Sequence, residues 1–330
     1  MRQSIVFRNA ALALMALLAV IAANARAVNI AWSPVGNPGN ATDGTGFGSV
    51  AYNYNIGTYD VTNSQYVEFL NAKDPNGTSP IQLYNSVMSH PNYGGINYNS
   101  GNANGSKYSV IPGNGNHPVN AVTWYDTIRF ANWLNNGQGN GDTETGAYTL
   151  LGATPTPSNG NSITRTVGAT IFLTSENEWY KAAYYNPATN SYYQYPTSSN
   201  TTPIGSNPTA LPNHVNVNPG APGSNLTDVG AYTGTTSPYG AFDMGGNIFQ
   251  WNEALNFFDT FAYRGLRGGA FYNSSFRSSD RFTNPPYDED IGTGFRLANI
   301  PTGYVIPEPS SLVLAALGFV ALAAWRLRRR

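Results

Sequence analysis

Three stretches of the chain combine a helix-start motif with apolar side chains at helical spacing. The motif is a capping box. In this motif the side chain of a Ser or Thr binds the backbone of the residue three positions later, and the carboxylate or amide side chain of that residue binds the backbone of the Ser or Thr. It occurs at 62–65, 123–126 and 175–178. The apolar faces that follow are Tyr66, Phe69 and Leu70; Trp124, Ile128, Ala131 and Leu134; and Trp179, Ala182 and Ala183. The sequence therefore predicts three short core helices, the second of which ends at 135–137.

The predicted strands are short and lie between long polar loops. Runs with the alternating or apolar pattern of strands lie at 50–56, 169–173, 265–272 and 294–298. Gly, Asn, Thr and Pro dominate the segments 72–116, 137–168 and 186–240. We interpret these segments as surface loops without sustained periodicity. Short helices, separate strands and long loops together predict an α+β fold, with Trp124, Trp133, Trp179 and Trp251 in its core.

The amino terminus has the pattern of a secretory signal peptide. Residues 1–27 combine two early arginines, an apolar run and an Ala-Arg-Ala cleavage site. The mature chain is therefore expected to begin near Val28, with an N-terminal extension over residues 28–49.

The carboxyl terminus carries a Pro-Glu-Pro triplet at 307–309, an apolar run and an arginine cluster. The run is short for a membrane span, and a plain C-terminal anchor is one interpretation. The order of the three parts resembles the PEP-CTERM sorting signal of Gram-negative bacteria that make extracellular polysaccharide, here at 301–330. The resemblance implies transient anchoring in the inner membrane, cleavage by an exosortase-type enzyme, and delivery to the cell surface or extracellular matrix.

Charge and cysteine content narrow the function classes. The chain of 330 residues has 17 basic and 18 acidic residues, which leaves no basic surface for nucleic acid. It contains no cysteine, so an exported domain of this size must be held by its core, with or without a metal ion, rather than by disulfides.

Glycines, aromatic residues and oxygen-bearing side chains are concentrated at 239–271. Within this stretch Asp243, Gly245, Gly246, Gln250 and Glu253 lie among aromatic residues. The arrangement predicts a tight turn that directs oxygen atoms toward a common centre while the aromatic rings anchor it to a core.

This stretch is part of a series of motifs that resembles the formylglycine-generating enzyme, or sulfatase-modifying factor, domain. The matching blocks, in the order that the family has them, are YDVTNSQYVEFLN (59–71), HPVNAVTWYDTIRFANWLN (117–135), FLTSENEWYKAAYYNP (172–187), DMGGNIFQWNE (243–253), RGLRGGAF (264–271) and GTGFRLA (292–298). The resemblance implies one domain over residues 50–300. It also implies a C-type-lectin-like fold with little regular secondary structure and long loops.

The resemblance has a catalytic consequence. Active members of the family generate formylglycine with a pair of copper-binding cysteines, the first of which lies three residues after an Arg-Gly-Gly-small motif. Asn273 occupies that position here. An amide cannot supply the soft thiolate that binds Cu(I), so we expect no copper and no formylglycine-generating activity, and we assign no catalytic residue.

Calcium is the cofactor that the resemblance favours. In the family a structural calcium ion lies in the glycine turn, and its ligands correspond to the Asp243 side chain, the carbonyls of Gly246 and Ile248, and Gln250. The family commonly has Glu at this last position, so the loss of one negative charge lowers the expected affinity. A second family site would begin at Asn216 and Val217, although its partner carboxylate has no clear match at 220–225.

The last motifs also contain several arginines, which are Arg267, Arg277, Arg281 and Arg296. We expect them to brace the fold through ion pairs with Asp243, Glu253 or Asp280, and the alternative is an arginine-lined groove for an anionic glycan. The segment 272–287 has the Asn, Ser and Tyr content of an adaptable binding surface. Its candidate ligand-binding residues are Asn273, Arg277, Arg281 and Tyr287. The acidic run at 288–290 is predicted to be a solvated loop.

Two functions from different classes follow. The first is an exported, non-catalytic protein of the surface or matrix that binds extracellular polysaccharide or an envelope protein. The alternative is an oxidoreductase or other modifying enzyme that retains the family scaffold with altered active-site chemistry. The missing cysteines favour the first. So do the three histidines, His90, His117 and His214, because none is spaced for a helix-borne metal site.

Overall fold

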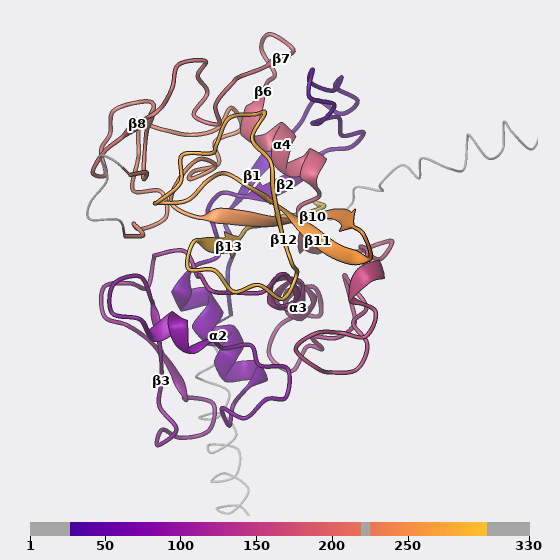
Figure 1. Ribbon diagram of the computed structural model, residues 1–330, viewed down its shortest axis with the longest axis vertical. Coiled ribbons are helices and arrows are strands. Elements are labelled where there is room, and N and C mark those ends of the chain that lie inside the picture. Colours follow the sequence, from indigo (N-terminus) through magenta and orange to yellow (C-terminus); the bar gives the residue numbers. More distant parts are fainter. Residues whose placement is uncertain (1–26, 219–224, 302–330) are drawn as a thin grey trace, which may run out of the picture.

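The computed structural model describes residues 27–218 and 225–301 (Figure 1). The signal peptide, apart from its last residue, and the predicted sorting signal, apart from residue 301, lie outside the described residues. Within the part of the chain that is described, no helix combines the length and the apolar character that a membrane span requires.

All three predicted helices are confirmed. They are α2 (Asn63–Lys73), α3 (Trp124–Asn135) and α4 (Glu176–Tyr184). Each begins with the predicted capping box, in which Thr62, Thr123 or Ser175 accepts a hydrogen bond from the backbone of the third helical residue. Two 3-10 turns, η1 (Ser86–Ser89) and η2 (Gly160–Ser162), lie in the predicted loops.

One antiparallel sheet joins the two ends of the domain. Its strands, in spatial order, are β1 (Trp32–Val35), β2 (Tyr54–Gly57), β14 (Leu297–Asn299) and β5 (Ile171–Leu173). β1 lies in the segment that we predicted as an N-terminal extension, and β2 begins four residues later than the predicted strand at 50–56. The segment 28–49 therefore contributes an edge strand to the folded core.

A second sheet carries the late motifs. Its strands, in spatial order, are β12 (Phe282–Asn284), β11 (Phe261–Arg267), β10 (Phe249–Phe258) and β13 (Thr293–Phe295). β10 pairs antiparallel with β11 across a register shift between Trp251 and Leu255, and parallel with β13. β10 is longer than any predicted strand and was not expected, because residues 249–258 were interpreted as part of a turn.

The remaining strands form two-stranded ribbons in the long loops. They are β3 (Ile96–Tyr98) with β4 (Tyr108–Val110), β6 (Tyr185–Asn186) with β7 (Ser191–Tyr192), and β8 (Ile204–Gly205) with β9 (His214–Val215). Figure 1 shows β8 at one end of the long axis and β3 at the other, with β10 and β11 between them.

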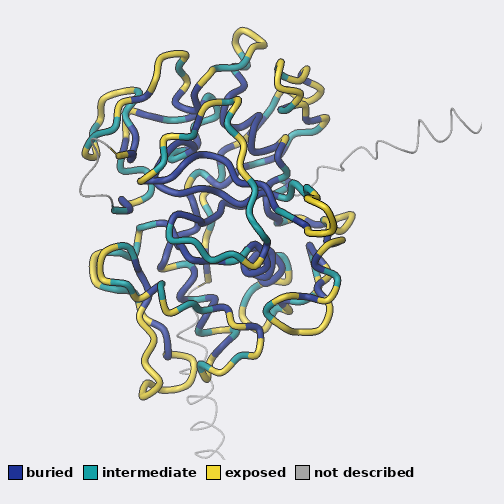
Figure 2. Tube along the Cα trace, in the orientation of Figure 1, coloured by how far each residue is buried: buried dark blue, intermediate teal, exposed yellow. Residues whose placement is uncertain are grey.

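Aromatic side chains fill the core between these elements. Trp124, Trp179 and Trp251 are fully buried and Trp133 is nearly so, as predicted. Figure 2 shows buried chain through the centre of the molecule and exposed chain in the peripheral loops. Apolar burial thus stabilises a fold with little regular secondary structure.

Candidate functional site

The glycine turn at 243–247 has a backbone that few residues can adopt. Asp243 and Asn247 have φ angles of 55° and 61°, and Gly246 has a φ of 78°. A Cβ atom at Gly246 would lie 2.5 Å from the carbonyl oxygen of Asn216. Only glycine fits here, because the position requires both a left-handed backbone and a close approach to another segment.

Gln250 directs its amide into the core. Its Oε1 accepts hydrogen bonds from Trp179 Nε1 at 2.6 Å and from Arg296 Nε at 2.7 Å, and its Nε2 donates to the Asp243 carbonyl at 2.8 Å. The residue is fully buried. It therefore connects the glycine turn to α4 and to the GTGFRLA motif.

Arg296 continues this buried network. Its Nη2 lies 3.1 Å from Asp60 Oδ1 and donates to the Phe242 carbonyl, and its Nη1 donates to the Gly57 carbonyl. Burial raises the pKa of Asp60 to about 8, against the opposing effect of the Arg296 charge. The partner of Arg296 is Asp60, so the expected pairing with Asp243 or Glu253 is corrected.

The other arginines also have partners that the sequence did not predict. Glu176 binds both Arg267 and Arg281, at 2.8 Å and 2.7 Å. Glu253 binds Arg165, whose Nη2 lies 2.7 Å from Glu253 Oε2. The expected ion pairs that brace the fold are therefore confirmed for Arg267 and Arg281, but their partner is Glu176 rather than Asp243, Glu253 or Asp280, because sequence proximity does not determine which distant carboxylate reaches a given arginine.

The glycine turn does not fit a calcium ion that uses Gln250 as a ligand. Calcium needs six to eight oxygen ligands, whereas the Gln250 oxygen already accepts two hydrogen bonds, one of them from a guanidinium. Asp243 Oδ2 accepts the Gly230 N–H at 2.6 Å, and the Gly246 carbonyl accepts the Ile248 N–H at 2.8 Å. These oxygen atoms are therefore already used in hydrogen bonds within the turn and to Gly230, Trp179 and Arg296.

Asn216 offers a different environment. Its side-chain nitrogen donates to the Asn225 carbonyl and to Asn247 Oδ1, both at 2.9 Å, and Val217 beside it is buried. Asn216 Oδ1 is buried and has no hydrogen-bond partner among the described residues. A buried acceptor of this kind is suited to a donor or a cation. The described residues contain no group of three or more His, Asp or Glu side chains placed to hold a metal ion.

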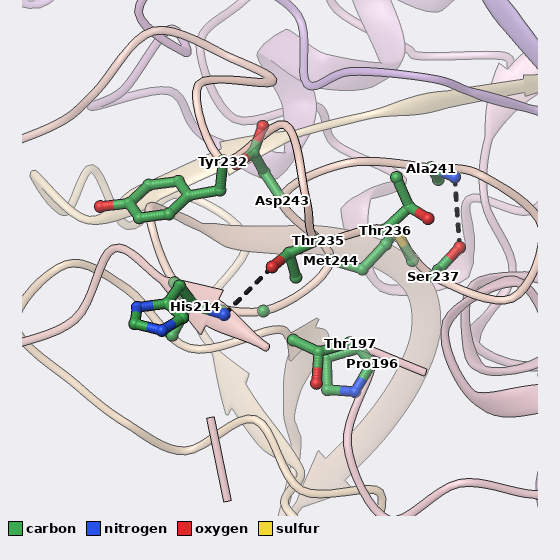
Figure 3. A pocket seen from close by; sticks show the side chains of 12 residues that line it. Pro196, Thr197, His214, Tyr232, Thr235, Thr236, Ser237, Ala241, Asp243 and Met244 are labelled. Atoms are coloured by element: carbon green, nitrogen blue, oxygen red, sulfur yellow. Dashed lines mark hydrogen bonds between the residues drawn. The ribbon is translucent and has the colours of Figure 1, made fainter. Parts of the chain in front are cut away.

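A small pocket lies against the glycine turn (Figure 3). Asp243, His214, Tyr232 and Thr235 contribute to its wall, and its volume is about 10 Å³. The His214 backbone N–H donates to Thr235 Oγ1 at 3.0 Å, which links β9 to the loop on the other side. A cavity of this size holds about one water molecule and no organic ligand.

A larger cleft lies beside the predicted binding segment. It has a volume of about 440 Å³ and takes its wall from 195–205, 217–218 and 274–280. We call it the arginine cleft, and its lining consists of Tyr195, Thr202, Pro203, Gly205, Val217, Asn218, Ser274, Ser275, Phe276, Arg277 and Asp280. Arg277 Nε donates to the Tyr195 hydroxyl at 3.0 Å, and the guanidinium lies 5.8 Å from that ring's centroid.

The four predicted ligand-binding residues do not all meet in this cleft. Arg277 lines it, and Asn273 directly precedes two residues of its wall. Arg281 instead binds Glu176, and Tyr287 follows Pro286, whose carbonyl accepts the first N–H of α3. The sequence did not predict Tyr195, Thr202 or Asn218 as cleft residues, because they come from a loop segment without a recognisable motif.

Residues of the acidic run at 288–290 and His117 have hydrogen-bond or charge partners within the fold. Glu289 accepts a hydrogen bond from Asn85, and Asp288 accepts one from Asn284. His117 Nε2 lies 3.6 Å from Asp228, and burial lowers the pKa of His117. The acidic run is therefore half-buried and bonded to other loops, rather than simply solvated.

Comparison with known proteins identifies the family. A sequence model of the sulfatase-modifying factor enzyme 1-like domain matches residues 48–300. The chain belongs to this family. The sulfatase-modifying-factor domain is followed by a match to the PEP-CTERM protein-sorting motif at residues 305–330, which indicates an exported protein of the cell surface or extracellular space that is processed by exosortase-type machinery. No protein of curated function matches the chain.

Solved structures show the same fold. Treponema denticola variable protein 1 superposes with a TM-score of 0.54 at 19% identity, covering 84% of this chain and 98% of that one. The crystal structure of CarF superposes with a TM-score of 0.54 at 18% identity, covering 83% of this chain and 99% of that one. These similarities confirm the predicted C-type-lectin-like α+β fold of the sulfatase-modifying-factor domain. At such low identity they describe the fold alone.

Proposed function

We propose that this sulfatase-modifying-factor domain is an exported, non-catalytic binding protein. Its arginine cleft engages extracellular polysaccharide or another component of the cell envelope. The observation that carries this proposal is the residue at the position of the family's first copper-binding cysteine, which is Asn273.

The surroundings of Asn273 support a structural role for the residue. Its backbone exchanges two hydrogen bonds with Ala270, at 2.9 Å and 2.8 Å, and its side-chain oxygen accepts the Ser275 N–H at 2.8 Å. The amide thus closes a local turn instead of presenting a nucleophile or a soft metal ligand. With no cysteine in the chain, the thiol chemistry of the active family members has no substitute at this position.

The arginine cleft supports a binding role. An arginine has five N–H donors, and one of those of Arg277 is used by Tyr195. The others can bind carboxylate, sulfate or hydroxyl oxygen atoms of a glycan. The exposed Ser274 and half-buried Ser275 lie in the same wall and add hydroxyl groups. Tyr195, Val217 and Phe276 of the same wall belong to one small apolar cluster with Val215, which packs these segments together.

The test is co-sedimentation of the protein with the producing cell's own extracellular polysaccharide. We expect retention, and we expect Arg277→Ala to weaken it about tenfold, the change that corresponds to one charge-assisted hydrogen bond. Lys73→Ala, which removes a cation that donates to the Gly141 carbonyl far from the cleft, is the matched control. Equal retention of Arg277→Ala and the native chain would remove the arginine cleft from the proposal. A copper or iron content near one per chain would favour the enzymatic alternative.

Calcium remains a proposal, and we place it at Asn216 rather than at Gln250. The buried, unpartnered Asn216 Oδ1 and the adjacent Val217 carbonyl would supply oxygen ligands, and the ion would have a structural role. We expect calcium to raise the melting temperature of the native chain but not of Asn216→Ala. If chelator and calcium give the same melting temperature for the native chain, the calcium proposal is wrong.

A further inference from the structure

A second cleft lies at the far end of the molecule from the arginine cleft. It has a volume of about 350 Å³ and is formed by the loop after α2, the η1 region, the β3–β4 hairpin and Glu289. We call it the tyrosine cleft, after Tyr84, Tyr98 and Tyr108. Figure 1 shows β3, which borders this cleft, and β8, which borders the arginine cleft, at opposite ends of the long axis.

The three tyrosines form one wall of mutually contacting rings. The ring centroids are 5.9 Å apart for Tyr84 and Tyr98, 5.2 Å for Tyr84 and Tyr108, and 5.3 Å for Tyr98 and Tyr108. Tyr108 is buried, Tyr84 is half-buried and Tyr98 is 37% exposed. Buried Tyr108 and half-buried Tyr84 therefore support the exposed part of the Tyr98 ring.

The position of Tyr98 depends on Gly77. The Tyr98 hydroxyl donates to the Gly77 carbonyl at 3.3 Å, and a Cβ atom at Gly77 would lie 2.4 Å from the Tyr98 ring. Gly77 also has a φ of 71°. The loop therefore holds the Tyr98 ring in one place, which reduces the entropy that binding would cost.

Polar groups line the cleft together with the rings. Asp74 accepts the Tyr108 hydroxyl, and its second oxygen accepts the N–H groups of Thr78 and Ser79, both at 2.8 Å. Glu289 accepts the Asn85 amide through Oε2. Its Oε1 can accept from a ligand, and the exposed Gln82 amide lies in the same lining.

The lining has a composition that selects among ligands. All ten lining residues are described, and they are Asp74, Gly77, Ser79, Gln82, Tyr84, Asn85, Ser86, Tyr98, Tyr108 and Glu289. None is basic, so the two carboxylates would repel a phosphate, sulfate or uronate. None is aliphatic, so the tyrosine rings provide the apolar surface of the cleft.

We propose that the tyrosine cleft binds a neutral hexose unit of a glycan. The C–H face of a sugar ring packs on an aromatic ring, and its hydroxyl groups donate to carboxylates and exchange hydrogen bonds with amides. The Tyr98 face and the Glu289 carboxylate provide these two kinds of contact in one cleft. The proposal goes beyond the proposed function, since it assigns a separate site with the opposite charge preference.

The experiment is affinity electrophoresis of the full-length protein in gels that contain a glucan, a galactomannan or polygalacturonate. We expect retardation in at least one neutral gel, and we expect Tyr98→Ala to weaken it about tenfold. Tyr98→Phe keeps the ring and should retain most of the affinity. Because Tyr98 is partly exposed, both variants should fold, which circular dichroism would verify.

The control is Phe261→Ala, which removes another exposed aromatic ring, 67% exposed, from the β10–β11 hairpin. Retardation that is absent from every neutral gel, confined to polygalacturonate, or unchanged in Tyr98→Ala would overturn the assignment. Arg277→Ala and Tyr98→Ala address different clefts. Failure of the proposed function and failure of the hexose site are therefore distinguishable.

Discussion

The arginine cleft and the tyrosine cleft differ in origin and in charge. The arginine cleft is built from the segments 195–205, 217–218 and 274–280, and it contains one arginine, whose side chain bonds to a neighbouring tyrosine hydroxyl, and one carboxylate, Asp280, which accepts the Arg277 backbone N–H. The tyrosine cleft is built mainly from the loop segment 72–116, and two carboxylates line it. One scaffold thus presents two surfaces that should prefer different glycans, an anionic one at the first cleft and a neutral one at the second.

The comparison also shows how each cleft is held. Behind the arginine cleft, Glu176 binds Arg267 and Arg281, and Arg267 also donates to the carbonyls of Ser278 and Asp280. In the tyrosine cleft, the contacts among Tyr84, Tyr98 and Tyr108 and the close approach of Gly77 to Tyr98 hold the wall in place. The first support is long-range and ionic, and the second is local and steric.

Glu176→Gln is expected to cause the largest loss of free energy of unfolding. The substitution leaves the buried Arg267 without its carboxylate, and breaking a buried ion pair in this way costs about 3–5 kcal/mol. Denaturant unfolding should show this loss. Retention that depends on Arg277 should fall as well, because the 278–280 segment loses its anchor.

Glu289→Gln is the matched control at the other cleft. Its carboxylate is half-buried and binds a neutral amide, so its loss should change the free energy of unfolding by less than about 1 kcal/mol. Equal destabilisation by the two substitutions would contradict the ionic support that we assign to the arginine cleft.

Gly77→Val is expected to cause a smaller loss of stability and a loss of neutral-glycan binding. The new side chain would contact the Tyr98 ring and would strain a left-handed backbone, at a cost of about 1–3 kcal/mol, and it should abolish retardation in neutral gels. Gly105→Val is the control, since Gly105 has a φ of 76° but no atom within 4 Å of the added Cβ. If both variants bind neutral glycan equally well, Gly77 does not position Tyr98 for binding.

The smallest effect is a pH dependence confined to the tyrosine cleft. Burial raises the pKa of Glu289, the hydrogen bond from Asn85 lowers it, and the charge of Asp288 raises it further. A protonated Glu289 no longer attracts sugar hydroxyl donors as strongly. Neutral-glycan affinity should therefore be complete above the raised pKa and should fall as the pH decreases through it.

Affinity at the arginine cleft should not fall over the same range, because a guanidinium keeps its charge. Affinity electrophoresis from pH 7 to pH 4 measures both trends, and Glu289→Gln should remove the dependence at the tyrosine cleft. A pH profile that is identical in the native chain and in Glu289→Gln would show that Glu289 does not contact the ligand.

The helices, their starts and the main core residues could be predicted from the amino-acid sequence alone. A capping box connects residues only three positions apart, so Thr62, Thr123 and Ser175 identify helix starts without reference to the rest of the chain. The buried tryptophans follow from the size and apolar character of their side chains. The ordered motifs also predicted the family, and through it the fold.

Which side chains contact one another could not be predicted in this way and depends on the folded arrangement. Asn85 and Glu289 are 204 residues apart, and Arg296 bonds to the Gly57 carbonyl 239 residues away. The inward orientation of Gln250 and the wall of tyrosines likewise depend on segments that are distant in sequence. No local pattern encodes such contacts, because they form only when the burial of apolar surface brings the loops together.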